Sequence, residues 1–309
     1  MKYNLSSNNQ HWLSTLHNTL SNVYLSQDEF RLALSSLQDL LSSVSNNVQH
    51  VLKASMAHFF AIHNTSETLF TKDQMQYVSN ILLQSCRMEI LSRQGRILLQ
   101  IGAISEAEYV FECIEKEELH KYNSALEHAS RVLESDALGK LYSEFLKLLK
   151  CQCSVIQQAP IQIALNKGLL EFAKEEYGNA MDSFKSAIDK QRLATKSKES
   201  TSAPNLFQEN FLSPGLGLSI ENTLITSCLN NLALCALYTC QMKKAVEYME
   251  DLICENPTMY LTEGLAFNLC TLYELGSENS VSGRKKNVLQ HIAKRFFLHD
   301  ITAEYFRIV

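Results

Sequence analysis

The sequence predicts an all-α fold built from paired helices, and two observations predict it. Glycine and proline are scarce, with 10 and 4 in 309 residues, whereas average usage would give roughly 22 and 15. One spacing also recurs along the chain: a small residue, a second small residue twelve positions later, and a large apolar residue four positions after that. Scarce breakers favour long helices, and a fixed spacing of small and large residues favours helices packed in pairs.

The segment from Asn166 to Ile188, NKGLLEFAKEEYGNAMDSFKSAI, carries the clearest copy of this spacing. It holds Gly168 in a helical pattern where Ala would be about 1 kcal/mol better. Ala180 follows twelve positions later, and Phe184 four positions after that. Small residues lie where two helices approach closely, because a missing side chain on one lets a large side chain on the other reach the backbone. We therefore expect a helix pair with Ala180 at its closest approach, facing the turn of helix around Gly168.

Three further segments repeat the spacing. The copies contain Gly95, Ala107 and Phe111; Ala233, Ala245 and Met249, followed by Pro257; and Ser21, Ala33 and Leu37. These spacings resemble the tetratricopeptide repeat, whose period is 34 residues and which forms helix-turn-helix units. The resemblance implies a right-handed α-solenoid. It assigns repeat packing to Gly95, Ala107, Phe111, Gly168, Tyr177, Ala180, Phe184, Ala233, Ala245 and Pro257.

The repeat spacing also predicts the organisation of the chain, which we expect to be a single array over residues 1–309. Repeats fill residues 10–193, with degenerate helix pairs near 48–70 and 122–150. Two of the four prolines, two glycines and a Ser/Thr/Lys cluster then predict a loop insertion at 194–220. Residues 221–309 hold further repeats, whose last helix we expect at 287–297. The final DITAEYFRIV is apolar enough to cap the open end of the array.

Charge and hydropathy exclude several classes of protein. A formal net charge of -5 argues against a general nucleic-acid binder. The longest apolar windows are shorter than the roughly 18 to 20 residues that span a bilayer, so we expect no transmembrane insertion. The N-terminal MKYNLSSNNQHWL lacks the apolar core of a secretory signal. We therefore expect the chain in the cytosol.

The residues that carry enzyme chemistry do not form a recognisable motif. Nine cysteines lie mostly in apolar helical runs and are typical of reduced core residues. Cys151 and Cys153 offer two thiolates, yet no second pair of ligands stands at metal-binding spacing nearby. Nine scattered histidines and the absence of a Gly-rich phosphate loop give no further support. We predict no catalytic residue, no cofactor and no metal, with an enzyme as the weakest alternative.

Interaction residues follow from the repeat resemblance, because such arrays bind partners through a concave surface lined by their first helices. The matching positions are Arg96, Gln100, Gln162, Leu169, Asn230 and Tyr238. Leu165 and Leu169 replace the polar pair of the clamp with which some family members bind a chaperone's C-terminal carboxylate, which argues against that role. A separate basic cluster admits two interpretations, a solvated helix start or a contact for an acidic partner or anionic membrane. It comprises Arg284, Lys285, Lys286, Lys294 and Arg295.

A closer resemblance lies in GLAFNLCTLYEL near the C-terminus and in WLSTLHNTLSNVYLSQDEFRLALSSL near the start. Both resemble the family of trafficking protein particle (TRAPP) complex subunit 12. That family implies a non-catalytic subunit of a vesicle tether in endoplasmic-reticulum-to-Golgi traffic and autophagy. The implied partners are other tether subunits and, indirectly, a Rab GTPase, at the periphery of Golgi and intermediate-compartment membranes. The family also has a long N-terminal region, so we expect a fragment or a shortened member. A tetratricopeptide adaptor in another pathway is the alternative.

Overall fold

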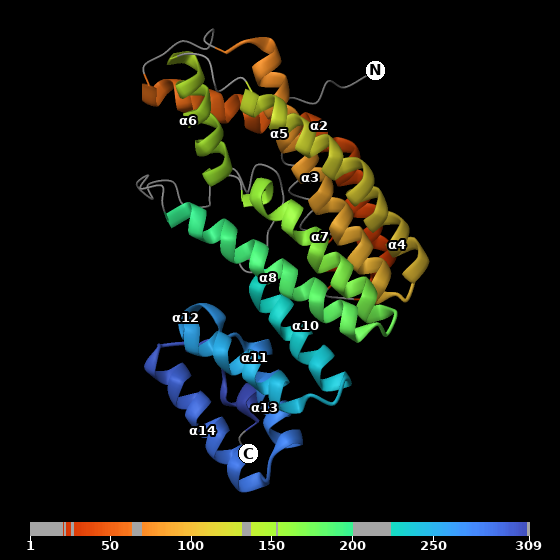
Figure 1. Ribbon diagram of the computed structural model, residues 1–309, viewed down its shortest axis with the longest axis vertical. Helices are drawn as coiled ribbons and strands as arrows, with labels where there is room; N and C mark the ends of the chain where they lie inside the picture. The colour runs from red at the N-terminus through yellow and green to blue at the C-terminus, as the bar shows by residue number, and fades with distance from the viewer. Residues whose placement is uncertain are drawn as a thin grey trace. The chain divides into compact units, whose positions relative to one another are not determined.

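The computed structural model describes residues 21, 23–25, 28–63, 70–131, 137–152, 154–199 and 224–307 (Figure 1). These residues are predominantly helical and contain no strand, which confirms the all-α class. They fall into two compact units, Met1–Asn166 with Leu193–Glu221, and Lys167–Arg192 with Asn222–Val309. The prediction of one continuous array over residues 1–309 stays a prediction.

Unit 1 is a layered set of long helices, coloured red to green in Figure 1. They are α2 (Phe30–His63), α3 (Lys72–Gln100), α4 (Ile104–Cys113), the π-helical turn η2 (Ile114–Glu118), α5 (Leu119–Arg131), α6 (Ala137–Gln152) and the first part of α7 (Ser154–Ala173). Helix α3 packs against α2, α4 and α5. Thr71 and Gln74 cap its start reciprocally, each side chain bonding the other's backbone N–H.

The core of unit 1 includes a cluster of aromatic rings where α2 ends and α6 passes. Phe59 lies 5.2 Å from Phe145 between ring centroids, and Phe70 lies 5.6 Å from both Tyr142 and Phe145. All of these side chains are buried. Such rings bury large apolar areas, so the cluster joins the ends of α2 and α6 firmly.

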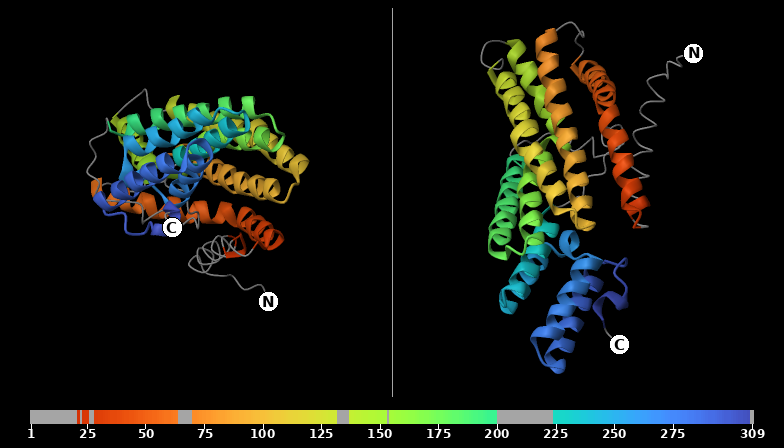
Figure 2. Two further views of the ribbon diagram at one scale, coloured as in Figure 1. Left: turned by 90° about the horizontal axis from the view of Figure 1, so that it is seen from below. Right: turned by 90° about the vertical axis from the view of Figure 1, so that its right-hand side faces the viewer.

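Unit 2 takes the end of α7 and most of α8 (Tyr177–Glu199), and continues with shorter helices to the C-terminus. These are α10 (Leu224–Tyr238), α11 (Met242–Glu255), α12 (Pro257–Tyr260), α13 (Glu263–Gly276), α14 (Asn279–Arg295) and the 3-10 turn η4 (Ala303–Phe306). Figure 2 shows α10 to α14, in cyan and blue, as antiparallel hairpins. The turn η4 packs against α13 and α14, with Phe306 buried.

Four of the helix-helix turns share one backbone conformation. In each turn, one residue has a positive φ. It lies five positions before the alanine that is the second small residue of the recurring spacing, for example Glu175 before Ala180. In each, that residue's N–H bonds a carbonyl three positions back and the next N–H bonds a carbonyl five positions back, which is the Schellman pattern. The positive-φ residues are Asp28 (58°), Gly102 (79°), Glu175 (64°) and Cys240 (60°). The recurring spacing therefore coincides with a recurring turn.

The small residues lie where the two helices of a hairpin approach each other. A Cβ added to Gly168 would stand 2.6 Å from Cε1 of Phe184, and Gly95 has the same relation to Phe111. Ala180 is fully buried. The glycines are present because an aromatic ring of the second helix occupies the space of a side chain. In the α10–α11 pair, the flexible Met249 takes the ring's place, and Ala suffices in place of glycine at Ala233.

The last hairpin, α13 and α14, carries the same spacing with polar residues. Cys270, Ser282 and Lys286 hold the three positions and all are buried. Helix α14 begins at Asn279, eight residues before the predicted start at 287. The segment SVSGRKK, residues 280–286, is helical although it contains Gly283. The turn before it is also different, since Ser277 has an extended backbone with φ of -150°.

Two predicted segments differ from the structure. The pair predicted near 48–70 does not start as a separate helix, because residues 48–63 belong to α2, which runs unbroken over 34 residues from Phe30 to His63 with no glycine or proline to stop it. Residues 64–69 lie outside the described residues. Residues 194–199 of the predicted loop at 194–220 are helical, because α8 continues to Glu199, and residues 200–220 lie outside the described residues. The first proline of that segment is Pro204, and the Lys/Ser/Thr run before it is compatible with a helix. The region predicted as a pair near 122–150 contains most of α5 and most of α6.

Candidate interaction surface

A buried polar network in unit 1 joins α3 to α7. Gln162 donates to Glu89 and accepts from Arg96. Arg96 also donates to Asn166 Oδ1 at 3.2 Å, and Asn166 donates to Ser92 Oγ at 2.7 Å. Arg93 completes the chain by an ion pair of 2.8 Å with Glu89, which is only 3% exposed. Because nearly every polar group has a partner, the network fixes the register of α7 on α3.

This network changes the interpretation of two predicted groove residues. Gln162 is 2% exposed, so its amide serves the packing of α3 and α7 and is not accessible to a partner. Arg96 is half-buried in the same network. Gln100, at the end of α3, is exposed. The sequence alone did not reveal the burial, because Gln and Arg usually lie on the surface.

Of the three predicted residues of unit 2, one is exposed. Tyr238, at the end of α10, is 58% exposed and stacks on Tyr177, with ring centroids 4.9 Å apart and planes 8° from parallel. Phe172 of α7 meets Tyr238 edge-on at 5.7 Å. Leu169 and Asn230 are half-buried, and Asn230 Oδ1 accepts a hydrogen bond of 2.7 Å from Asn268.

The aromatic set of Phe172, Tyr177 and Tyr238 has the chemistry of a protein-binding anchor. Tyrosine offers a broad apolar ring with a polar end and loses little conformational entropy on binding. The stacking already restricts Tyr238, so a partner would meet a preformed surface. Tyr177, which is half-buried, thus contributes to this aromatic set as well as to the hairpin between α7 and α8.

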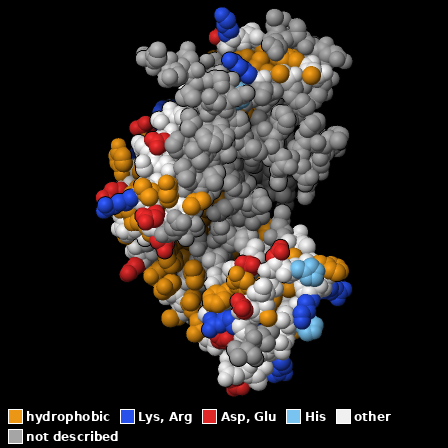
Figure 3. Space-filling view, turned by 180° about the vertical axis from the view of Figure 1, so that it is seen from behind, with side chains coloured by type: hydrophobic (Ala, Val, Ile, Leu, Met, Phe, Trp, Pro, Cys, Tyr) orange, Lys and Arg blue, Asp and Glu red, His pale blue; other side chains and the backbone are white. Residues whose placement is uncertain are grey.

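A second surface of unit 2 is a groove formed by α11, α13 and α14. Its hollow has a volume of about 300 Å³ and includes Ile253, Leu269 and Val288 among its lining residues. Glu250 lies at its side, where its Oε1 accepts from Tyr273 Oη at 2.8 Å and from Lys285 Nζ at 3.0 Å. Figure 3 shows hydrophobic, basic, acidic and His side chains close together on the surface of unit 2.

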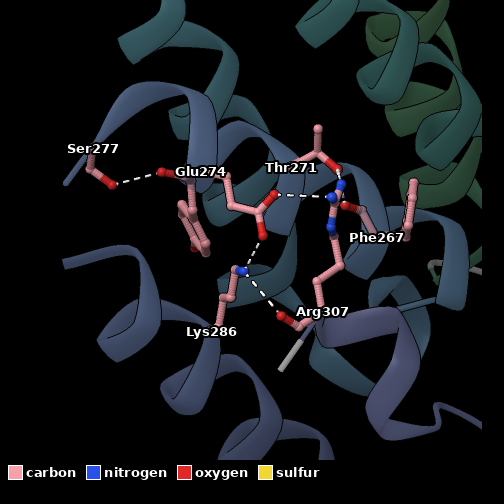
Figure 4. A network of polar contacts seen from close by, with 7 residues as sticks. Phe267, Thr271, Glu274, Ser277, Lys286 and Arg307 are labelled. Carbon is pink, nitrogen blue, oxygen red and sulfur yellow. Dashed lines mark hydrogen bonds and ion pairs between the residues drawn. The ribbon is translucent and has the colours of Figure 1, made fainter. Parts of the chain in front are cut away.

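A polar clasp joins α13, α14 and the residue after η4 (Figure 4). Lys286 donates to Glu274 and, at 3.2 Å, to the backbone oxygen of Arg307. Arg307 pairs with Glu274 at 3.2 Å, donates to Thr271 at 3.0 Å and lies 5.3 Å from the ring centroid of Phe267. The hydrogen bond from Lys286 holds the pKa of Glu274 below its usual value. The clasp fixes the orientation of α14, so that Arg284 and Lys285 line the groove.

The basic cluster of the sequence is thereby divided. Lys285 and Lys286 have carboxylate partners in Glu250 and Glu274. Among the described residues, no carboxylate forms an ion pair with the other three cations. Those three are Arg284, Lys294 and Arg295, all exposed on α14. Two cations of the cluster therefore hold helices together within the chain, and the other three are exposed on the surface of α14.

The described cysteines differ in their burial. Burial raises the pKa of the Cys235 and Cys270 thiols to about 11, as expected for core residues. Cys240 and Cys254 are exposed, in contrast to the core position predicted for most cysteines. No group of three or more possible metal ligands occurs in the part of the chain that the structure describes. Cys153 and the side chain of Cys151 lie outside the described residues.

None of the helices in the described ranges has both the length and the hydropathy needed to cross a membrane.

The sequence analysis did not predict the clasp between α13, α14 and Arg307. The signal was present, because continuing the recurring spacing to Cys270 and Ser282 places Lys286 where earlier copies have Phe111, Phe184 or Met249. A buried cation needs a polar acceptor, and here the Glu274 carboxylate and the Arg307 carbonyl accept from Lys286.

Comparison with curated proteins finds two matches of the same name. Over 207 residues, which are 67% of this chain and 18% of the relative, the chain is 24% identical to trafficking protein particle complex subunit 12 of mouse (Mus musculus). Over 64 residues, which are 21% of this chain and 9% of the relative, it is 38% identical to the human (Homo sapiens) protein of that name. No protein-family model matches the chain. The matches span less than a fifth of these relatives' length and support a distant relationship to this TRAPP subunit.

Proposed function

We propose that the chain is a non-catalytic scaffold subunit of a TRAPP-type vesicle tether. The observation that carries the proposal is the match to trafficking protein particle complex subunit 12 over two thirds of the chain. The match takes in only part of the relative, so the role of the complete subunit is part of the proposal. A scaffold role agrees with the architecture, since paired helices offer long surfaces for other proteins.

The helix pairs themselves are tetratricopeptide-like repeats in this proposal. Support comes from the shared Schellman turns and from the ring-over-glycine packing at Gly95 and Gly168. The partner surface we propose lies on unit 2, around the exposed Tyr238 and the half-buried Leu169 and Asn230. We no longer include Gln162, because it is buried.

The cellular setting follows from the same relationship. The chain binds other subunits of the tether and contacts a Rab GTPase only indirectly through them. It acts at the periphery of membranes between the endoplasmic reticulum and the Golgi, and in autophagy. The alternative function is a tetratricopeptide adaptor in another cytosolic pathway, which the same helix pairs would serve equally well.

Affinity purification with mass spectrometry tests the proposal and separates it from the alternative. Tagged wild-type chain is expected to recover TRAPP subunits, and Tyr238→Ser is expected to recover less, because it removes the exposed half of the stacked pair. Tyr109→Ser is the matched control, since Tyr109 is 75% exposed in α4 of unit 1. Recovery of other proteins without any TRAPP subunit would favour the adaptor. Equal recovery by both variants would remove Tyr238 from the proposed surface.

A further inference from the structure

The outward face of α14 joins positive charge to exposed apolar side chains. The helix NSVSGRKKNVLQHIAKR has five Lys or Arg residues and no acidic residue. Arg284, Val288 and Arg295 lie on one face, since eleven residues make about three turns. Val288 is 60% exposed and also lines the hollow. Neither Arg284 nor Arg295 forms an ion pair with a carboxylate of the described residues, whereas Lys285 pairs with Glu250 of α11.

The hollow beside this face is apolar within and charged at its rim. Ile253, Leu269, Val288, Leu289 and Ile292 line it, with Arg284 and Lys285 among its other lining residues. Its volume of about 300 Å³ can receive one or two apolar side chains of a partner. A flat lipid surface would touch the rim of such a hollow without filling it, whereas a helix can place a side chain inside.

The charge expected of a partner follows from which charged side chains at the rim already have a partner within the chain. Glu250 is satisfied by both Tyr273 and Lys285, so it makes little demand for a further cation. Arg284 donates only to the backbone oxygen of Ser280, at 3.2 Å, among the contacts of the described residues. Along the same face, Arg295 lies about 16 Å further on. The available charge is therefore positive, and carboxylates would complement it.

We propose that the groove between α11 and α14 binds an acidic amphipathic helix of a protein partner. Apolar residues of that helix enter the hollow beside Val288, and its carboxylates pair with Arg284 and Arg295. The inference deepens the proposed scaffold role by naming the chemistry of one partner segment. Its test uses the purified chain and synthetic peptides, so its failure is distinct from a failure to recover TRAPP subunits.

The test measures the dissociation constants of two fluorescent helical peptides by anisotropy with the full chain. Both peptides carry Leu at positions i, i+4 and i+7. One has Glu on its flanks and the other has Lys at the same positions. The Glu peptide is expected to bind and the Lys peptide to bind at least about tenfold more weakly. Arg284→Glu and Val288→Ser are each expected to weaken the Glu peptide, by about tenfold for Arg284→Glu. Lys244→Glu is the control, because Lys244 is exposed on α11 outside the groove lining.

Each variant is also followed by thermal unfolding, and unchanged midpoints are expected because both altered groove side chains are exposed. The proposal is overturned if the Glu peptide does not bind, if both peptides bind equally, or if Arg284→Glu behaves like Lys244→Glu. Vesicles containing phosphatidylserine form a further arm. Binding to them that depends on Arg284, without binding of the Glu peptide, would assign the face to a membrane and overturn the proposal.

Discussion

Pro160 lies inside α7, where it supplies no N–H to the carbonyl of Ile156, four residues before it. The hydroxyl of Tyr122, from α5, donates to that carbonyl at 3.1 Å and so replaces the missing backbone bond. Tyr122 is 7% exposed, and burial raises its pKa. The proline is tolerated in the helix because a side chain from a neighbouring helix supplies the donor.

Replacing Tyr122 by Phe is therefore expected to lower the free energy of unfolding by about 1 to 2 kcal/mol, because the Ile156 carbonyl loses its partner in a buried position. Denaturant titration measures this loss. In a Pro160→Ala background the new N–H can bond Ile156, and the same Tyr122→Phe change is expected to cost clearly less. An equal cost in both backgrounds would mean that the hydroxyl does not compensate for the proline.

Tyr142, in the aromatic cluster of unit 1, gives a prediction for alkaline pH. Burial raises its pKa to about 12, and its hydroxyl donates to the Gln74 backbone oxygen at 3.1 Å. The folded-state pKa is higher than the unfolded value of about 10, so this contribution to stability is complete below pH 10 and falls as the pH rises toward 12. Stability measured from about pH 8 to 11 is expected to fall less steeply in Tyr142→Phe than in the wild type. Identical slopes would show that this phenol does not resist ionisation.

At the scale of the helix, the hairpin is the part of the fold that the sequence predicts best. Gly168, Ala180 and Phe184 could be identified by spacing alone, because sterics at a close helix contact restrict residue size strongly. The shared turn could not be predicted from residue type. Asp28, Glu175 and Cys240 all have positive φ, although glycine would favour that conformation. There the hydrogen bonds of the turn outweigh the local preference.

The hairpin geometry predicts opposite effects for two identical substitutions. Gly168→Ala is expected to destabilise the chain by about 1 to 3 kcal/mol, because the new methyl meets the ring of Phe184. Gly178→Ala, in α8 of the same hairpin, is expected to be neutral or to stabilise by up to about 1 kcal/mol, since nothing lies within 4 Å of its added Cβ. Thermal midpoints give the comparison. Equal shifts for both variants would mean that ring-over-glycine packing does not hold the hairpin together.

At the scale of the whole molecule, the sequence predicts class and pairing better than helix length and burial. The 34 residues of α2 form one helix. Its length could not be predicted, because a degenerate repeat and a long helix have similar apolar patterns. The polar network around Glu89 and Gln162 depends on contacts between residues 73 positions apart, which no local pattern encodes. Of the residues predicted for the interaction surface, Tyr238 is exposed and Gln162 is buried, and binding by either stays a prediction. The clasp of Arg307 depends on contacts between segments distant in sequence.

The central claim concerns membership of a tether, and gel filtration of a cell extract tests it most directly. The chain alone has a mass of 35.0 kDa. If it is a scaffold subunit, the tagged chain elutes at a much larger size, in the same fractions as TRAPP subunits, and depletion of one such subunit shifts it toward smaller sizes. Elution of the chain near its own mass, with TRAPP subunits together in earlier fractions that lack it, would contradict the account.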